Sequence, residues 1–326
     1  MTIKTIAARA LFVSATALFA SNSAWALLPI QHWTETNGAK VYLVESPVIP
    51  MVDVQIDFDA GSRRDPAGQS GLANAVAAMA SKGVKAAGDA PALDENQLGE
   101  AWADLGASFD AGAGNDALHY VLRSLTDPPL LDRAARLAAR QIAEPSWSSD
   151  IWQRDRARWV ASIKESNTRP ATVAAHAFDA AVYGNHPYGT RTTEETLARI
   201  GVADMQAFHQ QSVAACRAKV SIVGAVTRAQ AQTLVATLLS RLPATASCAP
   251  LPPVAEVAAL TAASAEQDIP FVSAQAHVLI GQPGFTRRDP DFLALLVGNH
   301  ILGGGGFVSR LTNEVREKRG LSYSVY

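Results

Sequence analysis

The chain has 326 residues, of which 48% are hydrophobic and 18% are charged. This composition supplies enough apolar residues for one large or two medium hydrophobic cores, and it excludes an intrinsically disordered chain. The 28 basic and 30 acidic residues give a net charge of −2, so the basic surface of a nucleic-acid-binding protein is not expected.

The first 26 residues have the pattern of a secretory signal peptide. Lys4 and Arg9 give a positive start, an apolar run of 11 residues covers 10–20, and the letters SAWA at 23–26 fit an A-x-A cleavage site. The apolar run is shorter than the roughly 20 residues that span a bilayer. We therefore expect a signal peptide at 1–26 and a soluble, exported mature protein, with the periplasm as the favoured destination and the cell exterior as the alternative. An uncleaved membrane anchor is the alternative.

Strand and helix patterns alternate through the first two thirds of the chain. Apolar and polar residues alternate over 50–60, which is the period of a half-buried strand. Gly83 is a candidate C-cap and Asp94 a candidate N-cap of helices. Trp152 and Trp159, seven residues apart on one helix face, are predicted core residues. The predicted elements are, in chain order, strands at 40–45 and 50–60, helices at 70–82 and 94–105, a hairpin at 107–125, helices at 130–142, 149–165 and 170–183, a loop at 183–189, a helix at 202–212, a strand at 218–223 and a helix at 228–239.

A change in composition then divides the chain. Residues 244–265 are rich in proline and alanine, which is typical of an interdomain linker. A strand pattern follows at 272–280 and a helix pattern at 291–302. We therefore expect an N-terminal domain at 27–243 and the start of a C-terminal domain at 266–326.

The two predicted domains share a tetrapeptide. Arg-Arg-Asp-Pro occurs at 63–66 and again at 287–290, both times after a predicted strand and before a predicted helix. This repeat favours two homologous domains of the α+β class, each an antiparallel sheet flanked by helices on one face. The second domain is incomplete, because the chain stops at Tyr326 inside a predicted strand, so we expect a fragment of a longer protein.

The chain contains two cysteines, Cys216 and Cys248. Export permits a disulfide, but the sequence does not place the two sulfur atoms within bonding distance, so the bonded and the free forms are both open. Two cysteines without clustered histidines do not form a structural zinc site.

The run Gly-Leu-Ala-Asn-Ala-Val-Ala-Ala-Met at 71–79 resembles the opening helix of the pitrilysin/insulinase metallopeptidases, the inverzincins, whose pattern is G-L-A-H-x-x-E-H-M. In that family the two histidines bind zinc, the glutamate between them activates water, and a later glutamate is the third ligand. Here Asn74, Ala77 and Ala78 replace the first three of these residues, and Asp155 falls at the position of the last. Alanine has no lone pair and one acid does not hold zinc. The resemblance therefore implies a metallopeptidase-like domain with a degenerate zinc motif and no bound metal.

Other catalytic chemistries lack their motifs. The seven histidines include no pair at i, i+4 and no H-x-x-E-H, and the chain has no G-x-S-x-G nucleophile elbow. The glycines at 303–306 are not followed by the Gly-Lys-Ser/Thr of a phosphate-binding loop. A serine or cysteine hydrolase and a nucleotide-binding protein are therefore not expected.

The C-terminal run is similar to the second-domain signature of the same family, which is a glycine-rich loop, then S-R-L, then E-V-R-E-x-x-G-L-x-Y. In the family, the arginine and tyrosine of this signature reach the zinc site of the facing domain, and here they are Arg316 and Tyr323. The resemblance implies that both position substrate. Local composition alone favours a solvent-facing charge at Arg316 and a core residue at Tyr323. The glycine-rich loop is implied to bind substrate backbone, through Gly303, Gly304, Gly305 and Gly306.

A chain that keeps the arginine–tyrosine signature and lacks the zinc ligands suggests two chains with divided roles. Some bacterial members of the family are similar in arrangement, with one chain contributing zinc and a homologous chain contributing the arginine–tyrosine pair. The resemblance thus implies the non-catalytic subunit of an exported heterodimeric zinc endopeptidase.

Such a subunit would be inactive alone, would bind no cofactor, and would pair with a homologous zinc-bearing subunit on peptide or unfolded protein substrates. Neither nucleic acid nor a stable membrane span after signal cleavage is expected. The alternative is a catalytically inactive peptide-binding or scaffold protein of the same fold. The sequence names neither the substrate nor the partner.

Overall fold

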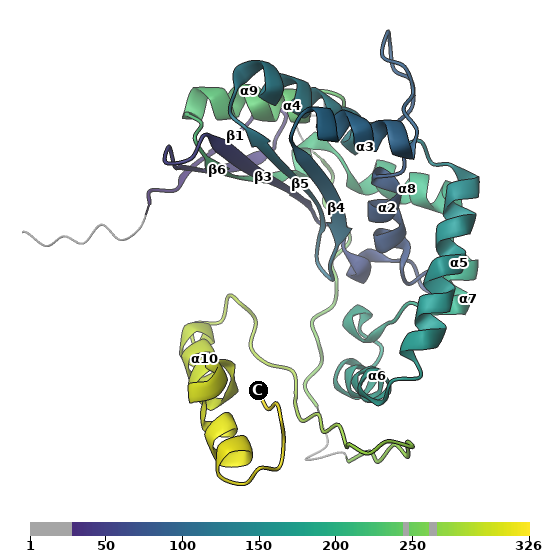
Figure 1. Cartoon of the computed structure of the whole chain (residues 1–326), viewed down its shortest axis with the longest axis vertical. Helices are drawn as coiled ribbons and strands as arrows, with labels where there is room; N and C mark the ends of the chain where they lie inside the picture. The colour runs from purple at the N-terminus through teal and green to yellow at the C-terminus, as the bar shows by residue number, and fades with distance from the viewer. Residues whose placement is uncertain (1–27, 244–247, 261–265) are drawn as a thin grey trace, which may run out of the picture. The chain divides into compact units, whose positions relative to one another are not determined.

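The computed structural model describes residues 28–243, 248–260 and 266–326 (Figure 1). The chain divides into two compact units, the first comprising Met1–Arg169 with Thr190–Val254 and the second Pro170–Gly189 with Ala255–Tyr326. The signal peptide predicted at 1–26 lies outside the described residues, as does part of the predicted linker. The part of that linker that is described, 248–260, contains no helix or strand.

The first unit is built on a six-stranded sheet of order β1-β2-β6-β3-β5-β4. Its pairings are antiparallel except for β2 with β6, which is parallel. The predicted α+β class is confirmed, but the expectation of a fully antiparallel sheet is wrong at this pair. The cause is topological: β6 lies between β2 and β3, which run in opposite directions, so it must be parallel to one of them. The strands are β1 (Gln31–Thr34), β2 (Lys40–Glu45), β3 (Met51–Phe58), β4 (Ser108–Ala113), β5 (Leu118–Leu125) and β6 (Lys219–Gly224).

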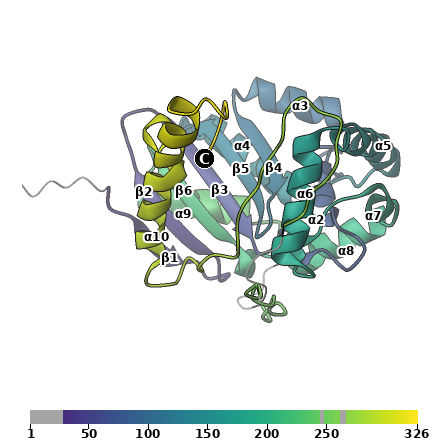
Figure 2. The same cartoon turned by 90° about the horizontal axis from the view of Figure 1, so that it is seen from below.

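One face of the sheet is buried. Val54 and Ile56 of β3 are buried, whereas Gln55 between them is exposed, as expected for a strand with one face in a core. The helices α4 (Pro128–Ala143) and α9 (Arg228–Leu238) cover the buried face, as Figures 1 and 2 show. Strands of this kind do not fold without such a cover, since burial of their apolar faces supplies most of the stabilising free energy.

Apart from α7, which was not predicted, the helices of the first unit begin and end close to the predicted residues. Asp94 caps its helix as predicted, accepting hydrogen bonds from the backbone N–H groups of Asn96 and Gln97 at 2.9 Å each. The described residues contain no helix that is long and apolar enough to cross a membrane. Besides α4 and α9, the helices are α2 (Leu72–Ala80), α3 (Glu95–Asp104), α5 (Ser149–Ser166), α7 (Glu194–Ala198) and α8 (Val202–Ser212), with single turns η1 (Ser62–Arg64) and η3 (Ala215–Arg217).

The first Arg-Arg-Asp-Pro run anchors the start of α2. The Asp65 carboxylate accepts hydrogen bonds from the backbone N–H groups of Gly71 at 2.8 Å and Ala73 at 2.9 Å. These donors would otherwise lack partners at the helix N-terminus. Gly71 has a φ of 105°, which favours glycine, and a Cβ atom there would lie 2.8 Å from Thr192. Arg64 pairs with Asp59 at 2.6 Å and so ties this turn to the end of β3.

Cys216 and Cys248 are joined in a disulfide, with Cα atoms 5.8 Å apart. Of the two forms that the sequence left open, the structure thus has the bonded one. Arg217 adds a hydrogen bond to the Ala249 carbonyl at 2.9 Å. Together these bonds attach the segment after α9 to the turn that precedes β6.

The second unit contains helices but no described strand. The strand expected at 272–280 is wrong: this segment is irregular, and Val278 and Ile280 are exposed. A strand needs a neighbour to satisfy its backbone groups, and the described residues of this unit offer none. The strand expected at Tyr326 fails for the same reason. The elements are α6 (Pro170–Tyr183), η2 (Pro187–Gly189), α10 (Phe292–Asn299), η4 (His300–Gly304), η5 (Gly306–Val308) and η6 (Thr312–Glu317).

Replacing Asp65 with asparagine will make the stability of the fold less dependent on pH. Burial raises the pKa of Asp65 to about 6, although the carboxylate accepts backbone hydrogen bonds. The folded state then holds this proton more tightly than the unfolded state, so this carboxyl weakens the fold as pH rises from about 4 to about 6. In urea unfolding, the wild type should lose about 1–2 kcal/mol relative to Asp65→Asn between pH 4.5 and pH 7.

Asp59→Asn is the control of opposite sign. Partial burial raises the pKa of Asp59, but hydrogen bonds from Arg64 and Arg63 outweigh it and the pKa is lowered. Asp59 therefore contributes stability that is present at neutral pH and is lost as pH falls below about 4. Identical pH profiles for the wild type and Asp65→Asn would contradict the effect assigned to Asp65.

Candidate functional site

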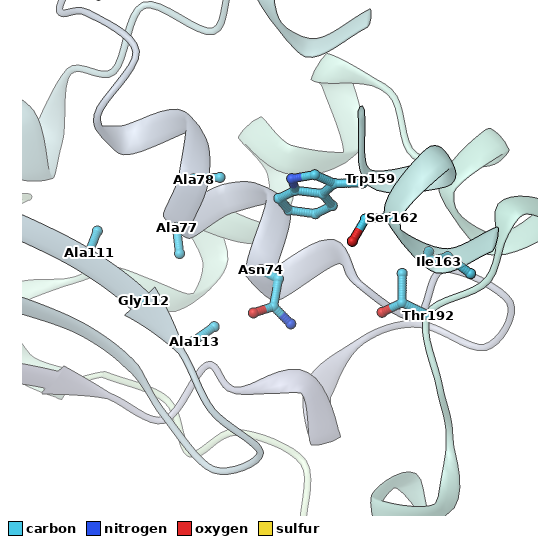
Figure 3. Close-up of a pocket in the computed structure, with 10 residues that line it drawn as sticks. All are labelled: Asn74, Ala77, Ala78, Ala111, Gly112, Ala113, Trp159, Ser162, Ile163 and Thr192. Carbon is cyan, nitrogen blue, oxygen red and sulfur yellow. The ribbon is translucent and has the colours of Figure 1, made fainter. Parts of the chain in front are cut away.

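The helix α2 places the three degenerate motif positions beside one cavity. Asn74, Ala77 and Ala78 line it from α2, and the cavity has a volume of about 450 Å³ (Figure 3). Residues three and four apart share a helix face, so the spacing of the motif brings the three side chains together as predicted. The other lining residues come from β4, α5 and the loop before α7, namely Ala111, Gly112, Ala113, Trp159, Ser162, Ile163 and Thr192.

This site does not fit a zinc ion. The cavity lining contains no histidine, cysteine, aspartate or glutamate. Across the residues that the structure describes, no group of three such side chains is arranged to hold a metal ion. Zinc sites in proteins use three or four such ligands, and an asparagine amide is a weak substitute.

Asp155 does not line the cavity. Its carboxylate lies 2.7 Å from Arg154, 3.4 Å from Arg158 and 3.8 Å from Lys82. The hydrogen bond from Arg154 lowers the pKa of Asp155 and outweighs the opposing effect of its burial. Asp155 is therefore an ionised member of a charge cluster at the end of α2.

Ser162, two helical turns after Asp155, occupies the cavity wall instead (Figure 3). The residue count from α2 predicted Asp155 as the third motif position, whereas the α5 residues that line the cavity are Trp159, Ser162 and Ile163. Ser162, Ile163 and Thr192 line the cavity and were not predicted from the sequence. The helical period would have found the first two, since they follow Trp159 at i+3 and i+4.

The two tryptophans of α5 have different environments. Trp152 is 3% exposed, which confirms its predicted core role, and its Nε1 donates to the Ile200 carbonyl at 2.9 Å. Trp159 is only partly buried and lines the cavity. The two indoles meet edge to face, with centroids 5.7 Å apart. Trp159 therefore belongs to the wall of the site as well as to the edge of the core.

In the second unit, the structure brings Arg316 and Tyr323 together. The Arg316 guanidinium carbon lies 5.1 Å from the centroid of the Tyr323 ring and 4.9 Å from that of Phe307. These are distances typical of cation–π contacts. Tyr323 is 86% exposed in the structure.

The four glycines lie between α10 and η6. Gly306 has a φ of 62°, in the left-handed region. A Cβ atom on Gly303 would lie 2.8 Å from the Tyr326 backbone, and one on Gly305 would lie 2.8 Å from the His300 carbonyl oxygen. Side chains would not fit at these two positions without a shift of the backbone around them.

Two protein-family models match the chain. The model described as "Insulinase (Peptidase family M16)" matches residues 40–196, and the one described as "Peptidase M16 inactive domain" matches residues 199–326. The chain belongs to the pitrilysin/insulinase family, peptidase family M16. This confirms the resemblance inferred from the helix at 71–79 and from the C-terminal signature.

Several known proteins are similar to this chain. A crystal structure of a peptidase M16 inactive domain from Pseudomonas fluorescens is 30% identical, with a TM-score of 0.78 over 92% of this chain and 70% of that one. The uncharacterized zinc protease YmxG of Bacillus subtilis is 23% identical over 91% of this chain and 69% of its own length. The periplasmic protease PqqL from Escherichia coli shares the fold, with a TM-score of 0.60 at 17% identity over 71% of this chain and 25% of PqqL. An uncharacterized zinc protease of Mycobacterium leprae is 26% identical over 90% of this chain, and the match covers 64% of that relative's length.

Restoring ligands on α2 and α5 tests where the third motif position lies. We expect the variant Asn74→His, Ala77→Glu, Ala78→His to bind zinc more tightly when Ser162→Glu is added, by a factor of about 10 to 100, because Ser162 lines the cavity. Competition with a chromogenic chelator measures the affinity. Ser162→Gln is the matched control, since it has the same size without the carboxylate. Equal affinity of the triple and quadruple variants would mean that Ser162 is not the third position.

Proposed function

We propose that this chain is the non-catalytic subunit of an exported heterodimeric zinc endopeptidase of family M16. The observation that carries the proposal is the cavity at the degenerate motif, which keeps the helix of a metal site and holds none of its ligands. A site lined by these residues cannot activate water through zinc. Its contribution to peptide hydrolysis must therefore come from other residues.

Arg316 and Tyr323 are the residues that we assign to this contribution. The two side chains contact each other and the Tyr323 ring is exposed, so one segment of the chain carries both a phenol and a guanidinium. In peptide hydrolysis a phenol can donate to the developing oxyanion, and a guanidinium can hold a carbonyl or carboxylate in fixed geometry. The homologous partner would supply zinc and the general base, and this chain would position the substrate.

Two observations support export. Residues 1–26 have the composition of a signal peptide, and the Cys216–Cys248 disulfide is a bond that persists in oxidising compartments and is rare in the cytosol. One structural neighbour, PqqL, is described as a periplasmic protease. We propose the periplasm for this chain as well.

A second candidate function is peptide binding or scaffolding without any part in catalysis. The cavity itself favours it, because a pocket of about 450 Å³ remains where metal chemistry has been lost. Under this function Arg316 and Tyr323 would have no effect on a partner's turnover.

Peptide hydrolysis measured during a titration separates the two candidates. The full chain should be inactive alone, and the zinc-bearing homologue from the same genome should gain activity up to a plateau at one chain per homologue. If the homologue is equally active without this chain, the subunit proposal is wrong and the scaffold function takes its place.

Within that complex, Tyr323→Phe and Arg316→Ala should lower kcat by about 100-fold, because each removes a donor that acts on the reacting peptide. Assembly, measured by analytical ultracentrifugation, should not change. The control is Lys318→Gln. This variant removes a positive charge from the same segment, and the partner of that charge is Glu314. Its kcat should change less than twofold. Normal turnover in both test variants would contradict their role.

A further inference from the structure

The cavity beside α2 has two chemically different ends. Ala77 and Ala78 present only methyl groups, as do Ala111 and Ala113 of β4 on the facing wall (Figure 3). The Asn74 amide and the hydroxyl-bearing side chains of Ser162 and Thr192 gather at the other end. An apolar wall with a few placed polar groups is the usual character of a ligand pocket, and about 450 Å³ lies within the range of such pockets.

One wall of the cavity is an aromatic side chain held in place from behind. The Trp159 indole packs edge to face on Trp152, at an interplanar angle of 89°. Trp152 is itself buried and hydrogen-bonded to the Ile200 carbonyl. Trp159 therefore offers a pre-positioned indole surface to a second ring, and aromatic pairs gain more than their buried area alone provides.

The polarity of the lining excludes charged occupants. No lysine, arginine, aspartate or glutamate lines the cavity, so an ionised group placed there would lose water without gaining a partner. Asp155, the acid nearest in sequence to the wall residues of α5, is already paired with Arg154, Arg158 and Lys82. The neutral Asn74, Ser162 and Thr192 can pair with a hydroxyl or an amide.

We propose that this cavity is a selectivity pocket for an uncharged aromatic side chain, phenylalanine or tyrosine, of a bound peptide. The replacement of the ligating side chains by Asn74, Ala77 and Ala78 opens the space that the ring fills, and Trp159 supplies the face on which it packs. The inference rests on the proposed function in one respect, that the chain handles peptides. It adds which residue of the peptide this subunit selects.

Binding of capped alanine pentapeptides that differ only at the central residue tests the pocket. Isothermal titration calorimetry with the full chain alone should give a Kd at least tenfold lower for central phenylalanine or tyrosine than for central aspartate or lysine. N-acetylphenylalanine amide, which has the ring without the peptide, should bind at least tenfold more weakly than the phenylalanine pentapeptide.

Two matched variants of α5 locate the binding. Ser162→Leu fills the cavity and should raise the Kd for the phenylalanine peptide at least tenfold. Ala161→Leu adds a leucine at the neighbouring position, which is also exposed but does not line the cavity, and should leave the Kd within twofold. Circular dichroism of both variants should match the wild type, since leucine is a good helix former.

Three results would overturn the proposal of an aromatic pocket. They are equal binding of the aspartate and phenylalanine peptides, no binding of either peptide at millimolar concentration, and the same effect of both leucine variants. Tighter binding of N-acetylphenylalanine amide than of the pentapeptide would also overturn it, because the pocket would then take small aromatic molecules. This test uses the chain without a partner. Its failure is therefore distinguishable from failure of the titration with the zinc-bearing homologue.

Discussion

The geometry of the site depends on the anchored first turn of α2. The Asp65 carboxylate holds the backbone N–H groups of Gly71 and Ala73, and Arg64 fastens the same turn to Asp59. Because successive residues of an α-helix are rotated by about 100°, fixing the first turn also fixes the directions of the side chains that follow. Asn74, Ala77 and Ala78 face the cavity for this reason, although none of them is a usual zinc ligand.

A zinc ion between α2 and α5 would cross-link the two helices and would contribute to the free energy of folding. Here other interactions connect α5 to its surroundings. The Trp152 indole is buried and bonded to Ile200, and Asp155 pairs with Lys82 beyond the end of α2. These contacts hold α5 at positions that precede its cavity-lining residues Trp159, Ser162 and Ile163. In our proposals, the space between the helices serves recognition, and Arg316 and Tyr323 act in a partner's reaction.

The elements that the sequence predicted well are those determined by local chemistry. The helix at 202–212 and the strand at 40–45 have the predicted bounds, and Asp94 caps the helix where its type and position indicated. The errors are non-local. The parallel pairing of β2 with β6 depends on a strand almost 180 residues away in the chain, which no local pattern encodes. The segment 272–280 has strand composition and lacks a neighbour.

In the site, the spacing of Asn74, Ala77 and Ala78 correctly predicted that they share one face of α2, because the geometry of a single helix determines that face. The residue count across loops carries no geometry, and Asp155, which it predicted, does not line the cavity.

The most direct test of this account is the metal content of the purified chain and of its complex with the zinc-bearing homologue. After dialysis against micromolar zinc and then buffer, we expect no stoichiometric zinc in this chain alone and one zinc per heterodimer in the complex. One tightly held zinc per chain in the absence of a partner would contradict the account.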